Sequence, residues 1–317
     1  MSTVDFDAEQ LALRDSVRAF LASDGYSWDR LTGELGLTAL AVPEDHGGFG
    51  ATLLEAGIAL EEAGAALLGA PLLSTTVAAL ALDPADPALA PLAAGTTIGA
   101  VAFGATVSDG LLHGRAEHVL DGDVADLFVV AAGDNLYAAE ASQVAVTVVP
   151  TLDTTRGQAT LVFDGVPARP AGPGRASHAL DLLRAALAAE SIGVARAALE
   201  ITIEHLRTRQ QFGVPLATFQ ALRHRVADLY VELEQATSTA RHALRVAGTA
   251  DFPVAAALAK LAAADAAYTV TREAIQLLGG IGFTWEHPAH RYLKRATTNH
   301  VLAGDPRTLR RSLLACV

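Results

Sequence analysis

The sequence contains very little cysteine or lysine. Its one cysteine is Cys316, so an intrachain disulfide is impossible and disulfide-built secreted scaffolds are excluded. Its lysines are Lys260 and Lys294, and every other basic residue is arginine or histidine. The formal net charge is −12, which argues against a general nucleic-acid binder because phosphate neutralisation requires clustered Lys and Arg.

Long apolar runs and a recognisable leader are also missing. No uninterrupted apolar run reaches roughly 18 residues, so we expect no membrane span. The first residues, 1–7, lack the basic-then-apolar pattern of a signal peptide. Together with the single cysteine, these features predict a cytoplasmic protein.

What is present suits a folded protein of more than one domain. Hydrophobic residues make up 51% and charged residues 18% of the 317 residues, so a sizeable core can form and disorder is excluded. We predict an α+β multidomain fold with an N-terminal helical domain at 1–93, a shortened antiparallel β domain at 94–172, and a C-terminal four-helix bundle at 173–317.

The division into three domains rests on the spacing of hydrophobic residues. In the first segment, apolar residues fall at helical spacing near residues 13–21, and a second helix is expected at 53–68. In the middle segment, short apolar or β-branched runs alternate with Gly and Asp turns, which is typical of strands. The expected strands are 97–103, 127–131, 144–149 and 159–163, followed by a Pro- and Gly-rich linker at 167–174. The third segment predicts long antiparallel helices with short connections, as in a bundle, at 179–208, 219–247, 254–278 and 306–314.

Two motifs lie at breaks between the predicted bundle helices. The first reads Arg-Gln-Gln-Phe-Gly-Val-Pro-Leu over residues 209–216 and is followed by Phe219 and Gln220. An arginine at a helix end can offer a planar fork of donors to a phosphate. Taken alone, the motif is equally compatible with an ordinary interhelical turn.

The second motif reads Gln-Leu-Leu-Gly-Gly-Ile-Gly-Phe-Thr-Trp-Glu-His over residues 276–287. Gly279 and Gly280 end the predicted helix, where glycine is favoured because it accepts left-handed dihedral angles. Without side chains they also let another molecule approach the backbone. A plain helix C-cap would explain this motif if it stood alone.

In combination, the two motifs resemble the acyl-CoA dehydrogenase family. The stretch Pro43-Glu44 … Gly47-Gly48-x-Gly50 and the order of the three segments match that family as well. The resemblance implies FAD as cofactor, bound between two subunits. One subunit's β domain holds the isoalloxazine ring, and the neighbour's bundle holds the pyrophosphate and adenosine part. It assigns the pyrophosphate contact to Arg209, and further FAD-binding positions to Gln211, Phe212, Leu216, Phe219, Gln220, Gln276 and Gly280.

The family reaction is α,β-dehydrogenation of an acyl-CoA thioester, which requires a carboxylate base in a dry pocket. The usual base position, 17 residues after Glu286, is Ala303 in this sequence. The alternative position, on the first bundle helix, is Leu183. By this resemblance, neither base position carries a carboxylate, so no catalytic residue is assigned in this chain.

Two other carboxylates are candidates for a displaced base. Asp305 lies two residues past Ala303, but Asp305 followed by Pro306 is typical of a helix N-cap. Glu190 lies two helical turns beyond Leu183, roughly 10 Å along the axis, which places it poorly.

The predicted β domain also departs from the family pattern. The segments 102–109 and 118–121 stand where the family's flavin-ring loop and Trp-Ile-Thr strand would be, and they keep little of either. The alternative is that these loops have diverged but still bind the flavin through backbone groups.

Three hypotheses follow from this pattern. The first is a non-catalytic partner subunit of a heteromeric enzyme. The segment 279–287, followed by Tyr-Leu-Lys-Arg at 292–295, resembles short paired acyl-CoA dehydrogenase subunits, which form α₂β₂ assemblies in bacteria and act on steroid side-chain thioesters. That resemblance implies a homologous catalytic subunit as partner, an acyl-CoA substrate and electron-transferring flavoprotein as acceptor. The second is a self-sufficient homomeric dehydrogenase with a displaced base, and the third is a flavin-free scaffold or regulatory protein with the same fold.

Overall fold

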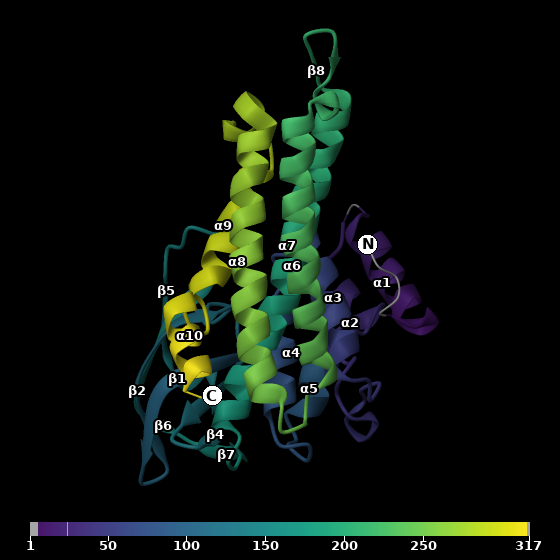
Figure 1. The fold of residues 1–317 in the computed structure, drawn as a ribbon. Helices are drawn as coiled ribbons and strands as arrows, with labels where there is room; N and C mark the ends of the chain where they lie inside the picture. The colour runs from purple at the N-terminus through teal and green to yellow at the C-terminus, as the bar shows by residue number, and fades with distance from the viewer. Residues whose placement is uncertain (1–5, 24, 316–317) are drawn as a thin grey trace.

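The computed structural model describes residues 6–23 and 25–315. Cys316 and the first five residues lie outside this range, so the expectations for them remain predictions. Figure 1 shows that the predicted order of helices, sheet and helical bundle is confirmed. The amino-terminal elements are the helices α1 (Ala8–Leu21), α2 (Trp28–Gly33), α3 (Leu53–Ala65), α4 (Leu72–Ala81) and α5 (Leu89–Ala93), with a 3-10 turn η1 (Glu44–His46).

Local capping explains where α1 and α3 begin. The Asp7 side chain accepts a hydrogen bond from the backbone N–H of Gln10, and the Gln10 side chain accepts one from the N–H of Asp7. Thr52 and Glu55 form the equivalent capping box at α3. Each box satisfies two amide groups that the first helical turn leaves without a partner.

The middle segment is one seven-stranded sheet with the order β5-β6-β2-β1-β3-β4-β7. All neighbouring strands are antiparallel except β1 and β3, which are parallel. The predicted antiparallel β domain is therefore confirmed, apart from this one pair. The bounds are β1 (Gly99–Ser108), β2 (Leu111–Leu120), β3 (Leu127–Ala132), β4 (Asn135–Glu140), β5 (Ala145–Val148), β6 (Gln158–Pro167) and β7 (Arg169–Gly172), with a 3-10 turn η2 (Ala141–Gln143).

Part of the predicted linker at 167–174 is strand β7, which the sequence did not predict. The strand lies at the sheet edge and pairs only with β4. A proline is tolerated at an edge because the missing N–H costs no central ladder bond. Pro170 therefore does not prevent pairing.

The bundle consists of α6 (Ala176–Thr208), α7 (Gln220–Arg245), α8 (Phe252–Leu278) and α9 (Ala289–Val301), followed by α10 (Pro306–Leu314). A short hairpin of β8 (Gln210–Gln211) and β9 (Val214–Pro215), with the turn η3 (Leu216–Thr218), joins α6 to α7, and η4 (Gly279–Phe283) follows α8. The predicted long helices are confirmed to within three residues at each end, whereas α9 was not predicted.

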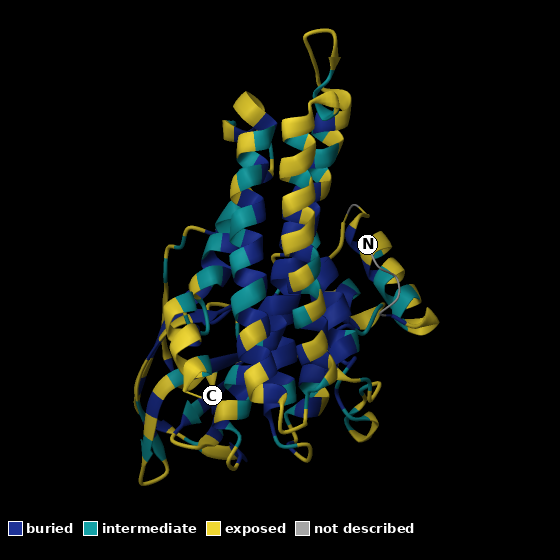
Figure 2. Cartoon of the chain, in the orientation of Figure 1, coloured by how far each residue is buried: buried dark blue, intermediate teal, exposed yellow. Residues whose placement is uncertain are grey.

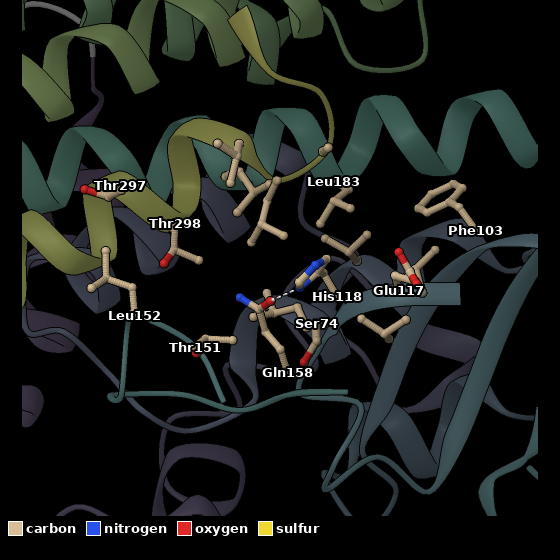
Figure 3. Close-up of a pocket in the computed structure, with 18 residues that line it drawn as sticks. Ser74, Phe103, Glu117, His118, Thr151, Leu152, Gln158, Leu183, Thr297 and Thr298 are labelled. Carbon is tan, nitrogen blue, oxygen red and sulfur yellow. Dashed lines mark hydrogen bonds between the residues drawn. The ribbon is translucent and has the colours of Figure 1, made fainter. Parts of the chain in front are cut away.

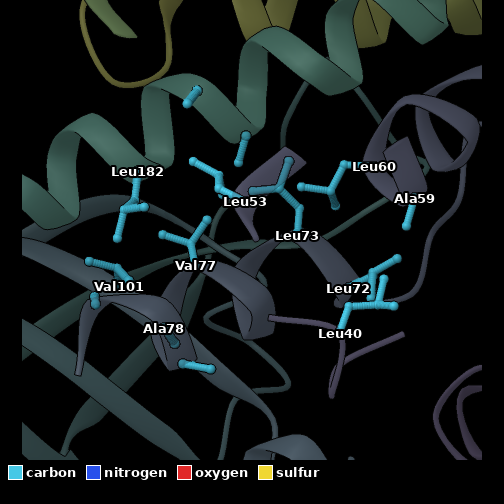
Figure 4. Close-up of a cluster of buried hydrophobic side chains, with 14 of the residues drawn as sticks. Leu40, Leu53, Ala59, Leu60, Leu72, Leu73, Val77, Ala78, Val101 and Leu182 are labelled. Atoms are coloured by element: carbon cyan, nitrogen blue, oxygen red, sulfur yellow. The ribbon is translucent and has the colours of Figure 1, made fainter. Parts of the chain in front are cut away.

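Close packing of α3 against α6 fixes the first bundle helix on the rest of the molecule. A Cβ atom on Gly193 would lie 1.8 Å from the carbonyl oxygen of Glu61, and one on Gly64 would lie 2.2 Å from that of Glu190. Only glycine permits this approach. Beside the contact, apolar side chains from α3, α4, β1 and α6 form the main core, and Figure 4 shows part of it.

Burial is uneven along the bundle. Figure 2 shows that buried residues gather in its lower half, next to α3 and α4, whereas its upper end is mostly exposed. The segment Phe252–Phe283, which contains α8, is long and apolar enough to cross a membrane by length and composition. Its most apolar 18-residue window is 61% buried inside this protein, as expected for a core helix.

Candidate functional site

Both sequence motifs lie at the same free end of the bundle. They follow the carboxyl ends of α6 and α8, two helices that pack against each other along their length, and Figure 1 shows this end far from the sheet. Burial, followed by the charges of His287 and Arg209, lowers the pKa of His205 in the last turn of α6. The structure therefore brings residues of the two motifs together.

The side chains that the resemblance assigns to FAD point away from the protein's own core. Phe212 is 92% exposed, and the Arg209 guanidinium makes no hydrogen bond to any residue that the structure describes. Leu216 is half-buried. The exposed residues of this set are Arg209, Gln211, Phe212, Phe219, Gln220, Gln276 and Gly280.

The glycines of the second motif play two different parts. Gly279 has φ +65° and ψ −140°, a backbone conformation that is essentially restricted to glycine. Gly280 has no such requirement, and a Cβ atom there would meet nothing within 4 Å. Packing among the described residues therefore does not require glycine at position 280. Close approach of another molecule to the backbone would require it.

The bundle end offers a donor set that fits the phosphates of FAD. A guanidinium provides charged, forked donors for phosphate oxygens, and the amides of Gln220 and Gln276 add neutral donors and acceptors. All three side chains are exposed.

A cavity of about 630 Å³ lies between the sheet and the bundle, far from this end. Both family base positions, Leu183 on α6 and Ala303 after α9, line it, and Figure 3 labels Leu183. The structure thus brings together two residues that are distant in sequence, and neither carries an ionisable group. The complete lining is Ser74, Val77, Val101, Phe103, Glu117, His118, Val119, Leu120, Thr151, Leu152, Gln158, Leu183, Leu187, Thr297, Thr298, Val301, Leu302 and Ala303.

Neither candidate for a displaced base lines this cavity. Asp305 is the N-cap of α10, as predicted, and its carboxylate accepts from the backbone N–H groups of Arg307 and Thr308 at 2.8 and 2.9 Å. These hydrogen bonds lower the pKa of Asp305. Its carboxylate is therefore committed to the helix start.

Glu190 belongs to a buried ion cluster instead. Its carboxylate accepts hydrogen bonds from Arg156 at 2.9 Å and from Arg295 at 2.7 Å, and Asn299 donates a third at 2.7 Å. Burial raises the pKa of Glu190, but the two guanidinium groups outweigh that effect and leave it below its ordinary value. A carboxylate held in this way is a weak base.

The titratable residues that line the cavity are Glu117 and His118, on β2. Glu117 forms an exposed ion pair with Arg115 at 3.0 Å. His118 has φ +54°, and the pairing of β2 with β6 shifts register between Ala116 and Val119. A bulge of this kind turns a side chain to a new direction, and here the His118 ring meets Gln158, with its Nδ1 3.2 Å from Oε1.

Sequence reasoning missed several polar residues around the cavity. Gln158 lies on its floor, and the Ser74 hydroxyl donates to the buried carboxylate of Asp121 at 2.6 Å. Burial raises the pKa of Asp121 to about 6. Asp121 and His118 stood in the segment noted for its departure from the family pattern, but no spacing rule connects either of them to Ser74 or Gln158.

Comparison with known proteins gives two family matches. The Acyl-CoA dehydrogenase N-terminal domain matches residues 7–84, and the Acyl-CoA dehydrogenase C-terminal domain matches residues 171–315. A curated relative, Acyl-CoA dehydrogenase IpdE2 of Mycobacterium tuberculosis, is 40% identical over 306 residues, which cover 94% of this chain and 90% of that protein.

Two solved structures have the same fold over nearly their whole length. One is the ChsE4-ChsE5 complex from Mycobacterium tuberculosis, with a TM-score of 0.89, 25% identity, and coverage of 98% of this chain and 97% of that one. The other is the Tcur3481-Tcur3483 steroid ACAD, with a TM-score of 0.88, 30% identity and 97% coverage of both chains.

Proposed function

Because the chain belongs to the acyl-CoA dehydrogenase family, we propose that it is the non-catalytic subunit of an FAD-dependent acyl-CoA dehydrogenase. In this proposal it contributes the pyrophosphate and adenosine half of the FAD site to a homologous catalytic subunit. The observation that carries the proposal is the contrast between an exposed, phosphate-compatible bundle end and a cavity in which both base positions are aliphatic.

The length of α6 supports a division of labour between two chains. Leu183 in the cavity and Arg209 at the bundle end are 26 positions apart on one continuous helix and its cap. At about 1.5 Å per residue, the two lie about 39 Å apart along the axis. A molecule held in the cavity therefore does not reach the bundle end, so the phosphate donors serve a molecule bound mainly by another chain.

The proposed partner supplies the groups that this chain lacks. Its carboxylate would remove the α-proton of the acyl-CoA thioester, and the bound FAD would supply the hydride-acceptor chemistry for the β-carbon. In this chain, Arg209 pairs with the pyrophosphate, and Gln211, Phe212, Leu216, Phe219, Gln220, Gln276 and Gly280 surround it. The backbone at Gly280 allows the cofactor to approach closely.

Other parts of the proposal rest on the relatives. A steroid side-chain thioester as substrate is supported by the likeness to the steroid ACAD, and an α₂β₂ assembly by the likeness to the ChsE4-ChsE5 complex. Electron-transferring flavoprotein as acceptor and a cytoplasmic location are family expectations that we retain.

Co-expression with the candidate partner tests the proposal. The chain is purified alone and with the product of the neighbouring gene, and the flavin spectrum and acyl-CoA turnover are recorded for each. We expect colourless, inactive protein alone and a yellow, active complex. A yellow, active chain on its own would contradict the partner role, and a colourless complex would favour a flavin-free scaffold.

An arginine variant tests the assigned contact within the complex. Arg209→Ala removes a charge-assisted hydrogen-bond donor, which typically contributes about 1.5–3 kcal/mol. We therefore expect FAD to dissociate at least about tenfold more readily in a dilution assay, with the complex still assembled. Arg311→Ala, which removes an exposed arginine on α10, is the matched control and should leave FAD retention unchanged. Equal retention in the two variants would refute the assignment of Arg209.

A further inference from the structure

We propose that the cavity between the sheet and the bundle binds a neutral, largely aliphatic molecule that carries a hydroxyl group. This inference goes beyond the role of the bundle end and does not depend on it. The proposed FAD role does not involve this cavity, and the present inference assigns a class of ligand to it.

The size and walls of the cavity suit a small organic molecule. Its volume of about 630 Å³ falls within the range of about 300–1,000 Å³ that is usual for ligand sites. Aliphatic side chains form the wall opposite the sheet, from α6 (Leu183, Leu187) and from the end of α9 and the residues after it (Val301, Leu302, Ala303). Burial of apolar ligand surface against this wall would drive binding.

The charges around the cavity select against anions. No lysine or arginine is among its lining residues, and the lining carboxylate is Glu117. A phosphate or carboxylate ligand would lose its hydration there without gaining a cation. The pyrophosphate of FAD and the ionised carboxylate of a fatty acid are therefore excluded as preferred ligands of this cavity.

Polar groups gather on one side of the cavity, where Figure 3 shows His118, Gln158, Ser74 and Thr151 together. Gln158 is only 3% exposed, yet its Nε2 has no protein partner among the residues that the structure describes. The amide faces the cavity, so its donor is available to a bound molecule. A ligand oxygen that accepts a hydrogen bond from Nε2 would satisfy it.

The adjacent histidine supplies the complementary acceptor. Gln158 Oε1 lies 3.2 Å from His118 Nδ1. In the tautomer in which Nδ1–H donates to Oε1, the ring Nε2 is an acceptor. One donor and one acceptor then stand side by side. A hydroxyl group, which both donates and accepts, satisfies the pair, whereas an ether or a hydrocarbon does not.

The backbone of β2 holds this arrangement in a strained form. His118 and Asp121 both have φ +54°, an uncommon conformation for residues other than glycine. Such strain costs on the order of 1–3 kcal/mol per residue and gathers at ligand sites. It is this strained bulge that turns the imidazole toward Gln158.

Displacement of a fluorescent probe tests the ligand class. The purified chain is loaded with 1-aminoanthracene, a neutral hydrophobic fluorophore, and titrated with dodecan-1-ol, 1-methoxydodecane, dodecanoate and FAD. We expect dodecan-1-ol to displace the probe at roughly tenfold lower concentration than the ether, a factor that corresponds to about 1.4 kcal/mol, and at lower concentration than dodecanoate. Preferential displacement by dodecanoate or by FAD, or equal displacement by alcohol and ether, would overturn the proposal.

Two variants locate the binding. Gln158→Leu keeps the approximate shape of the side chain and should abolish the preference for alcohol over ether, whereas Gln143→Leu, at an exposed glutamine of η2, should retain it. Leu183→Trp places a large side chain in the cavity and should reduce probe binding itself, in contrast to Val254→Trp at an exposed position of α8. A thermal melt checks that each variant is folded. Unchanged binding in folded Leu183→Trp would place the probe elsewhere and refute the site.

Discussion

The charged side chains around Glu190 are buried and paired, whereas the arginine of the motif at the free end of the bundle is exposed. Arg295 is fully buried and donates to Asp153 and Glu190 at 2.6 and 2.7 Å. Arg209, at the end of the same bundle, makes no side-chain hydrogen bond to any described residue. The cluster around Glu190 therefore finds its ion-pair partners within this chain, whereas the Arg209 guanidinium is available to a group outside it.

This difference predicts that separate regions determine the stability of the isolated chain and its assembly with a partner. Substitutions in the middle of the molecule should change the free energy of unfolding of the isolated chain. Substitutions at the bundle end should leave that free energy nearly unchanged and affect only the complex. Three variants test the separation, beyond those that address FAD and the cavity.

Arg295→Ala should produce the largest effect. It leaves Asp153 and Glu190 buried with a reduced set of partners, and breaking a buried ion pair typically costs about 3–5 kcal/mol. Urea unfolding of the isolated chain measures the loss. Arg310→Ala breaks an ion pair with Asp265 that is 55% and 38% exposed, and it should cost less than about 1 kcal/mol. Similar losses in the two variants would remove the distinction between buried and exposed charge.

Asp121→Asn should produce an intermediate, pH-dependent gain in stability. Burial raises the pKa of Asp121 to about 6 in the folded state, above the ordinary value near 3.9 of an unfolded chain. Between these values the folded state binds the proton more tightly, so the contribution of this group to stability is present below about pH 4 and is lost as the pH rises through 6.

Asp121→Asn removes the destabilisation that ionisation of Asp121 causes at higher pH, because asparagine does not ionise. We expect it to be more stable than the parent at pH 7 by on the order of 1–3 kcal/mol, with the difference vanishing near pH 4. Unfolding curves at several pH values measure this. Asp164→Asn, at an exposed position of β6, should show no such pH dependence. A parent chain that gains stability relative to Asp121→Asn as the pH rises would contradict the assignment.

Phe212→Ser should have the smallest effect on the isolated chain. A side chain that is 92% exposed contributes little to the fold, so the free energy of unfolding should change by less than about 0.5 kcal/mol. In the complex, the loss of a buried aromatic contact should weaken assembly by about tenfold or more, as measured by sedimentation. Leu314→Ser, 76% exposed on α10, is the control. Unaltered assembly in Phe212→Ser would mean that the partner does not cover this hairpin.

Sequence patterns predicted the long helices well and the sheet only in part. The helical period is clear over a segment as long as Ala176–Thr208. Strand β2 was missed because its residues do not alternate cleanly between apolar and polar and it contains Gly114 and the bulge at His118. Strand β7 was missed because Pro and Gly are typical of linkers, and only its edge position makes them acceptable.

The polar clusters were even harder to predict from the sequence. Arg156, Glu190 and Arg295 lie far apart in the chain, so their meeting depends on three-dimensional packing that no local pattern records. The same holds for the Gln158 amide beside His118, which depends on a register shift. In contrast, the absence of an ionisable group at Leu183 and Ala303 could be read directly, because a recognised family supplies the positions.

Helix α6 imposes a constraint on how this sequence can change. It carries Leu183 and Leu187 in the cavity near one end and Arg209 directly after the other. Because an α-helix advances about 100° per residue, one inserted or deleted residue between them would turn the arginine about a quarter of the way round the bundle. Substitutions on the exposed face of α6 should therefore be tolerated, while changes in its length should not.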